Sequence, residues 1–296
     1  MRLDALAARL AGATLSGDGS LEITAVTHDS RKAGPGTLFV AIKGLATDGN
    51  QFVEAARRKG ASAVASELPP QGSGSWLQVQ DAREALALLS AAVLGDPARK
   101  LELIGVTGTN GKTTTTYLVD AALRAAGHKV GLVGTVQYRI GDRLADATRT
   151  TPESSDLQAM FREMVDAGCS HAVIEVSSHS LALQRVAGSF FRVAVFTNLT
   201  RDHLDFHGDM ETYFQAKRTL FSDLLRPDGR AVINADDDRA AELARASRAP
   251  VWTFGLERPA DFQAEDVVLG RTCSPPSPPP RPRASTRRPR CAGWPR

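Results

Sequence analysis

Residues 104–116, IGVTGTNGKTTTT, combine a β-branched segment, a glycine-rich turn, a lysine and a row of threonines. Backbone N–H groups in such a turn, together with the start of the helix that follows, form a cradle for anions. Lys112 can bring a positive charge to the β- and γ-phosphates of a nucleotide, and the Thr113 hydroxyl suits Mg²⁺. Val106 stands where the strict phosphate-binding loop has glycine, so the segment is a variant, GTNGKT. A nucleotide-phosphate site is predicted.

A second segment that could carry chemistry is residues 171–181, HAVIEVSSHSL, where an apolar strand ends at Glu175 and a loop with Ser177 follows. Ligands of open α/β sheets bind at the carboxyl ends of strands, and a carboxylate there can hold Mg²⁺. We favour a metal or substrate loop. A Ser/His hydrolase lacks its G-x-S-x-G elbow here, and a capped turn without catalytic duty is the plainer alternative.

Residues 196–221, FTNLTRDHLDFHGDMETYFQAKRTLF, place His203 and His207 four apart with two aspartates between them. Zinc would need a third protein ligand and helical placement, whereas Asp and Gly in this stretch indicate a loop. We therefore favour a second divalent-ion or phosphate contact over zinc or a solvated loop. Lys217, taken alone, resembles any surface lysine. Residues 27–44, THDSRKAGPGTLFVAIKG, read by themselves as a loop after a strand.

Strand and helix signals alternate along the chain and must position these groups. A break at Gly95, Asp96 and Pro97 predicts a domain boundary. Before it we expect strands at 21–26, 37–43, 61–66 and 76–80 and helices at 51–59 and 81–94, besides a short amphipathic helix at the start. After it we expect strands at 101–107, 129–133, 171–176, 192–197, 230–234 and 250–254, with helices near 112–126, 155–167, 210–225 and 236–246. Doubly buried strands with helical crossovers predict a parallel α/β sheet.

Composition separates the last 26 residues from the rest of the chain. Residues 271–296 carry seven of the 36 Lys and Arg, no acidic residue and eight of the 16 prolines, so residues 1–270 carry a net charge of −4. We interpret the end as a proline- and arginine-rich tail that is disordered and out of frame; an in-frame disordered tail or a polyproline ligand are the alternatives. With a single cysteine before it, no 18-residue apolar run and no secretion signal, we expect a cytoplasmic protein without nucleic-acid partner or membrane span.

Taken together, residues 20–270 resemble the Mur ligase family. The resemblance rests on HDSRKAGPGTLFVAIKG, GVTGTNGKTTTT, TTPES, EVSSHSL, VFTNLTRDHLDFHGDM and YFQAKRTLF in one order. The phosphate loop alone would also admit folylpolyglutamate synthetase. TTPES together with EVSSH and DHLDFHGDM is similar to the MurE type, the UDP-N-acetylmuramoyl-tripeptide synthetases.

The resemblance implies three α/β domains and an ATP-dependent ligase of peptidoglycan precursor synthesis. Residues 1–97 would form the N-terminal domain that binds the UDP-sugar, residues 98–270 an incomplete ATP-binding domain with a parallel sheet, and the C-terminal Rossmann-like domain would be missing. ATP would phosphorylate the D-Glu carboxylate of UDP-MurNAc-L-Ala-D-Glu, and a diamino acid, meso-diaminopimelate in preference to L-lysine, would attack the acyl phosphate. The family default is a monomer.

The family's functional residues fall on matching positions of this sequence. ATP would be bound by Gly108, Thr109, Asn110, Gly111, Lys112, Thr113 and Thr114. Magnesium would be held by Thr113, Glu175, His203 and Lys217, the last as an N6-carboxylysine formed with CO₂; Lys112, Lys217, Glu175 and His203 would be catalytic. Substrate contacts would come from His28, Ser30, Leu45, Ala46, Thr47, Thr150, Thr151, Ser177 and Arg185.

Two features depart from the family. A glutamine often found two residues before the arginine is Leu183 here, although Gln184 adjoins that arginine. Nothing after Gly270 resembles the Asp-Asn-Pro-Arg segment that binds the diamino acid. We therefore expect a fragment with little or no ligase activity; a non-catalytic module that binds nucleotide or UDP-sugar is the alternative, and another P-loop ATPase or GTPase is a third.

Overall fold

The computed structural model describes residues 1–44 and 47–267. The first part of the chain forms a five-stranded sheet with the order β1-β5-β4-β3-β2, in which only β1 is antiparallel to its neighbour. Its elements are α1 (Leu3–Ala7), β1 (Thr14–Ser16), β2 (Ala25–Thr27), η1 (Ser30–Lys32), β3 (Thr37–Val40), η2 (Gly49–Phe52), α2 (Val53–Arg58), β4 (Ala63–Ser66), β5 (Ser75–Gln78) and α3 (Ala82–Val93). Asp81 caps α3, because its carboxylate accepts from the N–H groups of Arg83 and Glu84.

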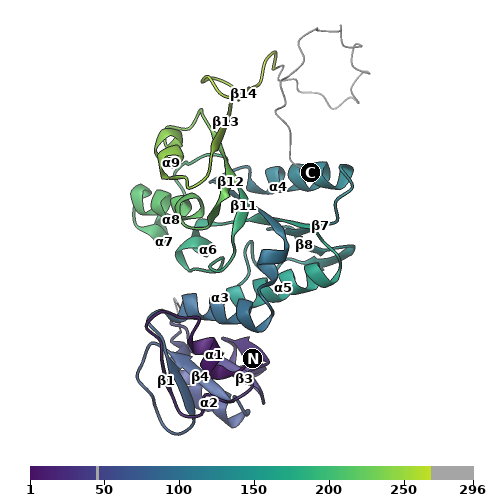
Figure 1. The fold of residues 1–296 in the computed structure, drawn as a ribbon. Helices are drawn as coiled ribbons and strands as arrows, with labels where there is room; N and C mark the ends of the chain where they lie inside the picture. Colours follow the sequence, from purple (N-terminus) through teal and green to yellow (C-terminus); the bar gives the residue numbers. More distant parts are fainter. Residues whose placement is uncertain (45–46, 268–296) are drawn as a thin grey trace. The chain divides into compact units, whose positions relative to one another are not determined.

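The second part of the chain forms a nine-stranded sheet with the order β14-β13-β12-β11-β6-β10-β7-β8-β9. All neighbours are parallel from β14 to β7, and β8 and β9 form an antiparallel hairpin at the edge (Figure 1). Its elements are η3 (Pro97–Lys100), β6 (Glu102–Thr107), α4 (Lys112–Ala125), β7 (Val130–Val133), β8 (Gln137–Ile140), β9 (Arg143–Asp146), α5 (Ser154–Asp166), β10 (His171–Glu175), α6 (Ser178–Ala182), β11 (Phe191–Phe196), α7 (Leu204–His207), α8 (Met210–Ser222), β12 (Leu225–Asn234), α9 (Ala240–Ala246), β13 (Val251–Gly255) and β14 (Phe262–Gln263).

Helices cover both faces of this sheet, which explains why its central strands are apolar throughout. Tyr117 and Leu123 of α4 pack over one face, against a cluster that includes Val106 and Val173. The opposite face is covered by α5, α6, α8 and α9, which bury a larger apolar cluster. The α/β class with parallel sheets is therefore confirmed.

Four adjacent strands of the sheet, β11, β6, β10 and β7, end at the same edge. The phosphate-loop segment follows β6, Glu175 ends β10, and the segments that begin at Gly134 and Thr197 follow β7 and β11. Parallel strands thus bring segments that are far apart in the sequence to one carboxyl edge, where ligands of such sheets bind.

Several element boundaries differ from the prediction. The strand expected at 21–26 is limited to β2, and the helix expected to run to 225 ends at Ser222. Leu225 instead begins β12, since its side chain is buried in the core and Pro227 cannot continue a helix. The hairpin of β8 and β9 was not predicted, because charged residues interrupt its alternation. The proline- and arginine-rich tail lies outside the described residues.

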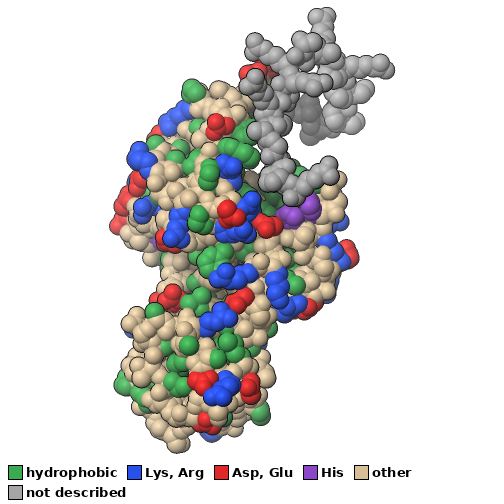
Figure 2. Space-filling view, in the orientation of Figure 1, with side chains coloured by type: hydrophobic (Ala, Val, Ile, Leu, Met, Phe, Trp, Pro, Cys, Tyr) green, Lys and Arg blue, Asp and Glu red, His purple; other side chains and the backbone are tan. Residues whose placement is uncertain are grey.

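Charged side chains are interspersed on the face of the molecule that Figure 2 shows. Lys and Arg lie beside Asp and Glu on this face. Ion pairs at the surface of the described residues include Arg226–Asp228 and Arg239–Glu211. Such a mixed surface agrees with the small net charge of residues 1–270. Among the described residues, no helix is both long and apolar enough to cross a membrane.

Candidate active site

The phosphate loop leaves β6 at Thr107 and enters α4 at Lys112, as the sequence predicts. Gly108 has φ +147°, and a Cβ on it would lie 1.8 Å from Oγ1 of Thr197, so only glycine fits there. The segment after β11 holds the loop in place: Thr197 donates to the Asn110 carbonyl at 2.7 Å, and Asn198 Oδ1 accepts from the Asn110 N–H at 3.0 Å. The threonine and asparagine of TNLT therefore shape the loop.

Two lysines point at one carbonyl of this loop. Lys112 Nζ donates to the carbonyls of Gly108 at 3.0 Å and Thr109 at 2.8 Å, and Lys217 Nζ donates to the Gly108 carbonyl at 2.9 Å. Lys217 projects from α8, where it is 1 % exposed and lies 4.5 Å from the centre of the Tyr213 ring. The lysine that looked like a surface residue in the sequence is thus buried beside the phosphate loop.

Burial controls the charge of both lysines. Loss of solvation, together with the nearby positive charge of Lys112, lowers the pKa of Lys217 to about 7. Burial also lowers the pKa of Lys112, although Glu175 and Asp202 oppose this shift. Lys217 therefore has a substantial neutral fraction at neutral pH, which a free lysine does not.

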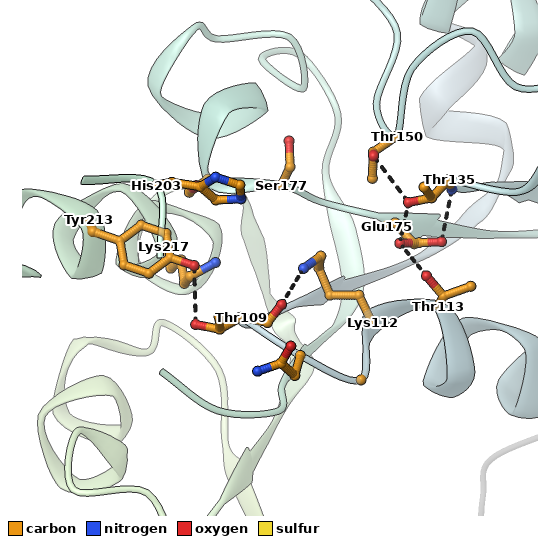
Figure 3. A pocket seen from close by; sticks show the side chains of 13 residues that line it. Thr109, Lys112, Thr113, Thr135, Thr150, Glu175, Ser177, His203, Tyr213 and Lys217 are labelled. Atoms are coloured by element: carbon orange, nitrogen blue, oxygen red, sulfur yellow. Dashed lines mark hydrogen bonds between the residues drawn. The ribbon is translucent and has the colours of Figure 1, made fainter. Parts of the chain in front are cut away.

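Glu175 is fully buried at the end of β10 and accepts three hydrogen bonds (Figure 3). The Thr113 hydroxyl donates to Oε2 at 3.0 Å, the Thr135 hydroxyl donates to the same oxygen at 3.0 Å, and the Thr135 N–H donates to Oε1 at 2.9 Å. The carboxylate predicted as a metal ligand is therefore held next to the threonine predicted to share that role.

These side chains line one cavity of about 270 Å³. His203 reaches it from the loop before α7, with its backbone in the left-handed region at φ +52°. The lining consists of Thr109, Asn110, Gly111, Lys112, Thr113, Thr135, Thr150, Glu175, Ser177, Ser178, His203, Tyr213 and Lys217. Two of the predicted loop residues are not among the lining residues. The Gly108 carbonyl accepts a hydrogen bond from Lys112, and Thr114 is exposed on α4. All four residues predicted to be catalytic thus meet at this cavity.

The predicted contacts to the muramoyl-dipeptide lie at and beside the cavity. Thr150 and Ser177 line it, and Ser177 also caps α6. Thr151 is 1 % exposed, and its hydroxyl donates to the Glu175 carbonyl at 2.7 Å. Arg185 forms an ion pair with Glu153 at 2.7 Å.

The predicted contacts to the uridine end lie elsewhere. His28 lines a second cavity of about 420 Å³, and its Nδ1 lies 3.2 Å from the Ser155 hydroxyl. Ser30 opens η1, and Thr47 is exposed, with its carbonyl accepting from the Gly44 N–H. Leu45 and Ala46 lie outside the described residues. His28, Ser30 and Thr47 are therefore not among the residues that line the phosphate-loop cavity.

Gln184 does not take the place of the glutamine that this sequence lacks at position 183. Its backbone is in the left-handed region at φ +53°, and its side chain donates to Asp81, the capping residue of α3, at 2.5 Å. The side chain is thus committed to α3.

Thr135 and Tyr213 line the phosphate-loop cavity and were missed by the sequence reasoning, as was Glu153, the ion-pair partner of Arg185. Tyr213 shares a hydrogen bond of 3.1 Å with Thr109, and Glu153 lies near three arginines, Arg83, Arg149 and Arg185. Thr135 follows a buried strand, and that position is the signal that could have identified it.

His207 gives the site a measurable acid sensitivity. Burial, helped by the positive charges of His179 and Lys217, lowers the pKa of His207 to about 4. The unfolded chain takes up this proton near pH 6.5, so the group's contribution to stability is complete above pH 6.5 and is lost as the pH falls toward 4. We expect His207→Gln to flatten the pH dependence of the free energy of unfolding in this range, measured by urea denaturation. Parallel curves for the two proteins would contradict it.

Family models match both parts of the chain. Residues 106–275 match the Mur ligase middle domain, and residues 22–94 match the model described as Mur ligase family, catalytic domain. The middle-domain match alone covers more than half of the 296 residues, so the chain belongs to the Mur ligase family.

Curated relatives and solved structures agree with this assignment. The chain is 48 % identical over 277 residues to UDP-N-acetylmuramoyl-L-alanyl-D-glutamate–2,6-diaminopimelate ligase of Geobacter metallireducens, and 57 % identical over 242 residues to that of Chlorobaculum tepidum. These alignments cover 91 % and 80 % of this chain but 54 % and 47 % of the relatives. A solved structure of such a ligase superimposes with a TM-score of 0.77 at 28 % identity, covering 89 % of this chain and 54 % of that one. The chain thus spans about half the length of the relatives it matches.

Proposed function

We propose that this chain provides the ATP site and the UDP-sugar acceptor site of a ligase that joins a diamino acid to UDP-MurNAc-L-Ala-D-Glu. The observation that carries the proposal is the cavity lined by the phosphate loop, where Lys112 and Thr113 meet Glu175 and Lys217. The names of the relatives support these substrates, with 2,6-diaminopimelate as the diamino acid.

Lys112 is the residue that we assign to the nucleotide phosphates. Its ammonium group donates hydrogen bonds to the carbonyls of Gly108 and Thr109. Both belong to the phosphate loop, and in loops of this kind the backbone N–H groups bind an anion. Phosphate oxygens are better partners for an ammonium group than neutral carbonyls are, because both partners then carry charge. Gly108–Thr114 would then bind ATP.

The donor set at the cavity fits Mg²⁺, which prefers oxygen ligands and takes only one or two carboxylates from the protein. Glu175 and Thr113 would hold the first ion; Oε2 of Glu175 and Oγ1 of Thr113 lie 3.0 Å apart. His203 and Lys217, which line the same cavity, would contribute to a second ion. No group of three His, Cys, Asp or Glu close enough to cage a metal occurs in the described part of the chain, so substrate phosphates would supply further ligands. When bound, Mg²⁺ supplies the positive charge that offsets the charge of the transferring phosphoryl group.

Lys217 is suited to carboxylation because its amine is buried and partly neutral near pH 7. The neutral nitrogen attacks the carbon of CO₂, and the proton it loses passes to solvent, which leaves an anionic carbamate. That change would turn a cation beside Lys112 into a metal ligand of opposite charge.

The reaction we assign to the cavity begins on the D-Glu carboxylate. A carboxylate oxygen forms a bond to the γ-phosphorus, the bond from that phosphorus to ADP breaks, and an acyl phosphate results. The amine of the diamino acid then bonds to the acyl carbon, loses a proton, and expels inorganic phosphate. Thr150, Thr151, Ser177 and Arg185 would position the dipeptide, while His28, Ser30 and Leu45–Thr47 of the domain 1–97 would hold the uridine end.

Ligand-induced stabilisation tests this proposal. We expect Mg²⁺ with ADP to raise the melting temperature, and UDP-MurNAc-L-Ala-D-Glu to do so separately. At a ligand concentration one hundred times the dissociation constant, each ligand should raise the free energy of unfolding by about 3 kcal/mol. UDP alone and ADP with EDTA serve as controls. If neither ligand changes the melting temperature, the proposal is wrong.

A non-catalytic module that binds nucleotide or UDP-sugar is the second candidate, since the same phosphate-loop cavity would also serve binding without turnover. Both candidates bind nucleotide, so turnover distinguishes them. Release of phosphate from ATP that requires both the UDP-sugar and a diamino acid would establish the ligase. Binding of both ligands without any phosphate release would establish the module.

A further inference from the structure

Thr135 makes three hydrogen bonds to predicted functional residues, yet no role follows for it from the motifs. It lies two residues after the end of β7 and lines the phosphate-loop cavity. Its N–H and its hydroxyl both donate to Glu175, one to each carboxylate oxygen, at 2.9 and 3.0 Å. Two of the three donors to this buried carboxylate therefore come from one residue.

Gly134 allows Thr135 to approach the Glu175 carboxylate closely enough to form these hydrogen bonds. A Cβ on Gly134 would lie 2.4 Å from Oε1 of Glu175, so the carboxylate rests directly against the glycine backbone. Glu175 itself is fully buried, which leaves its oxygens little freedom to turn away. The pair Gly134-Thr135 thus forms a fitted cradle for the carboxylate.

The Thr135 hydroxyl also lies 3.0 Å from the hydroxyl of Thr150. A hydroxyl has a single proton, and an ionised carboxylate only accepts, so the Thr135 proton is committed to Glu175. The Thr150 hydroxyl must then donate to Thr135. Both lone pairs of the Thr150 oxygen are then left for donors in the cavity, so Thr150 presents an acceptor to whatever binds there.

We propose that Thr135 is a positioning residue that orients the candidate metal ligand Glu175 and, through the same hydroxyl, the candidate substrate contact Thr150. The proposal rests on the proposed function and deepens it, because it links the metal side of the cavity to the acceptor side. It further assigns the ligand group that meets Thr150 as a hydrogen-bond donor, such as an amide N–H or a hydroxyl.

A purely structural role at the end of β7 predicts different behaviour. The Thr135 residue is exposed toward the cavity and outside the buried core, so replacing its hydroxyl by a methyl group removes little packing. A structural role would change the melting temperature and leave the Mg²⁺ dependence of nucleotide binding as it is. A positioning role would change that dependence.

The test compares Thr135→Val, which keeps the shape and loses the hydroxyl, with Thr135→Ser, which keeps the hydroxyl. Titration calorimetry would measure the affinity for ADP with and without Mg²⁺ and the affinity for UDP-MurNAc-L-Ala-D-Glu. We expect Thr135→Val to weaken Mg²⁺-dependent ADP binding and UDP-sugar binding by about tenfold each, as for a lost hydrogen bond to a charged group. Affinity for ADP without Mg²⁺ should be unchanged, and Thr135→Ser should restore both losses. Thr135→Ala, which also keeps the N–H, replaces the valine variant if that variant does not fold.

Unchanged affinities in Thr135→Val, or equal losses in the serine variant, would overturn the inference while the proposed function stands. If the unaltered chain itself binds neither ADP nor the UDP-sugar, the proposed function fails and the inference fails with it. The two failures are therefore distinguishable in one set of titrations.

Discussion

Replacing Lys112 by alanine is expected to weaken the binding of Mg²⁺-ADP by about tenfold to a hundredfold. The ammonium group would form charge-assisted hydrogen bonds with phosphate oxygens, each worth about 1.5–3 kcal/mol. Within the described part of the chain, the same group donates to the carbonyls of Gly108 and Thr109. Most of the loss should therefore appear in binding, measured by titration calorimetry, rather than in stability.

Lys129→Ala is the matched control for this variant. Lys129 precedes β7 at the opposite end of the strand, is exposed and pairs with Asp142. Its loss removes the same charge from the chain without touching the phosphate loop. Equal affinities in the Lys112 variant and the unaltered chain would show that the loop is not the phosphate site.

Replacing Lys217 by methionine is expected to stabilise the fold below pH 7 while it removes the proposed second metal ligand. In the folded chain Lys217 has a pKa of about 7, against an ordinary value of 10.5. The folded state therefore binds the proton of this amine more weakly than the unfolded chain does. Its charge therefore destabilises the fold fully below pH 7, and this penalty disappears as the pH rises toward 10.5. A shift of this size corresponds to about 4–5 kcal/mol, from which the lost hydrogen bond to Gly108 subtracts about 1.5–3. A net gain of roughly 2 kcal/mol, or about 4–8 °C, is expected.

Urea denaturation in CO₂-free buffer at several pH values measures this effect. The gain should be largest at pH 6 and shrink toward pH 10, whereas Lys129→Met should show no such trend. A Lys217 variant less stable than the unaltered chain at pH 6 would contradict the account. Addition of ¹³C-labelled bicarbonate would separately reveal a carbamate signal that the methionine variant lacks.

The sequence was sufficient to predict the parts of the site that depend on local chemistry. The glycines, lysine and threonine of the phosphate loop lie within a few residues of one another. An apolar strand that ends in Glu175 places this carboxylate at the carboxyl end of a strand in a parallel sheet. The order of the strands and the residues that meet across that edge depend on tertiary packing, which spacing does not encode.

Three residues show where the local pattern of residues around a position does not reveal its surroundings in the fold. Thr135 is an ordinary threonine in the sequence, and only the pairing of β7 with β10 places it against Glu175. Lys217 has the pattern of a surface lysine until α8 packs beside the phosphate loop. Gln184 adjoins Arg185 in the sequence, but its side chain is bound to Asp81.

The most direct test of the central claim is a calorimetric titration of the 296-residue chain with ADP in the presence of Mg²⁺ and then of EDTA. The account predicts one binding site whose affinity falls when EDTA removes the metal, and falls again in the Lys112→Ala variant. Absence of binding, or binding that neither EDTA nor the loss of Lys112 weakens, would contradict the assignment of this cavity as a magnesium-nucleotide site.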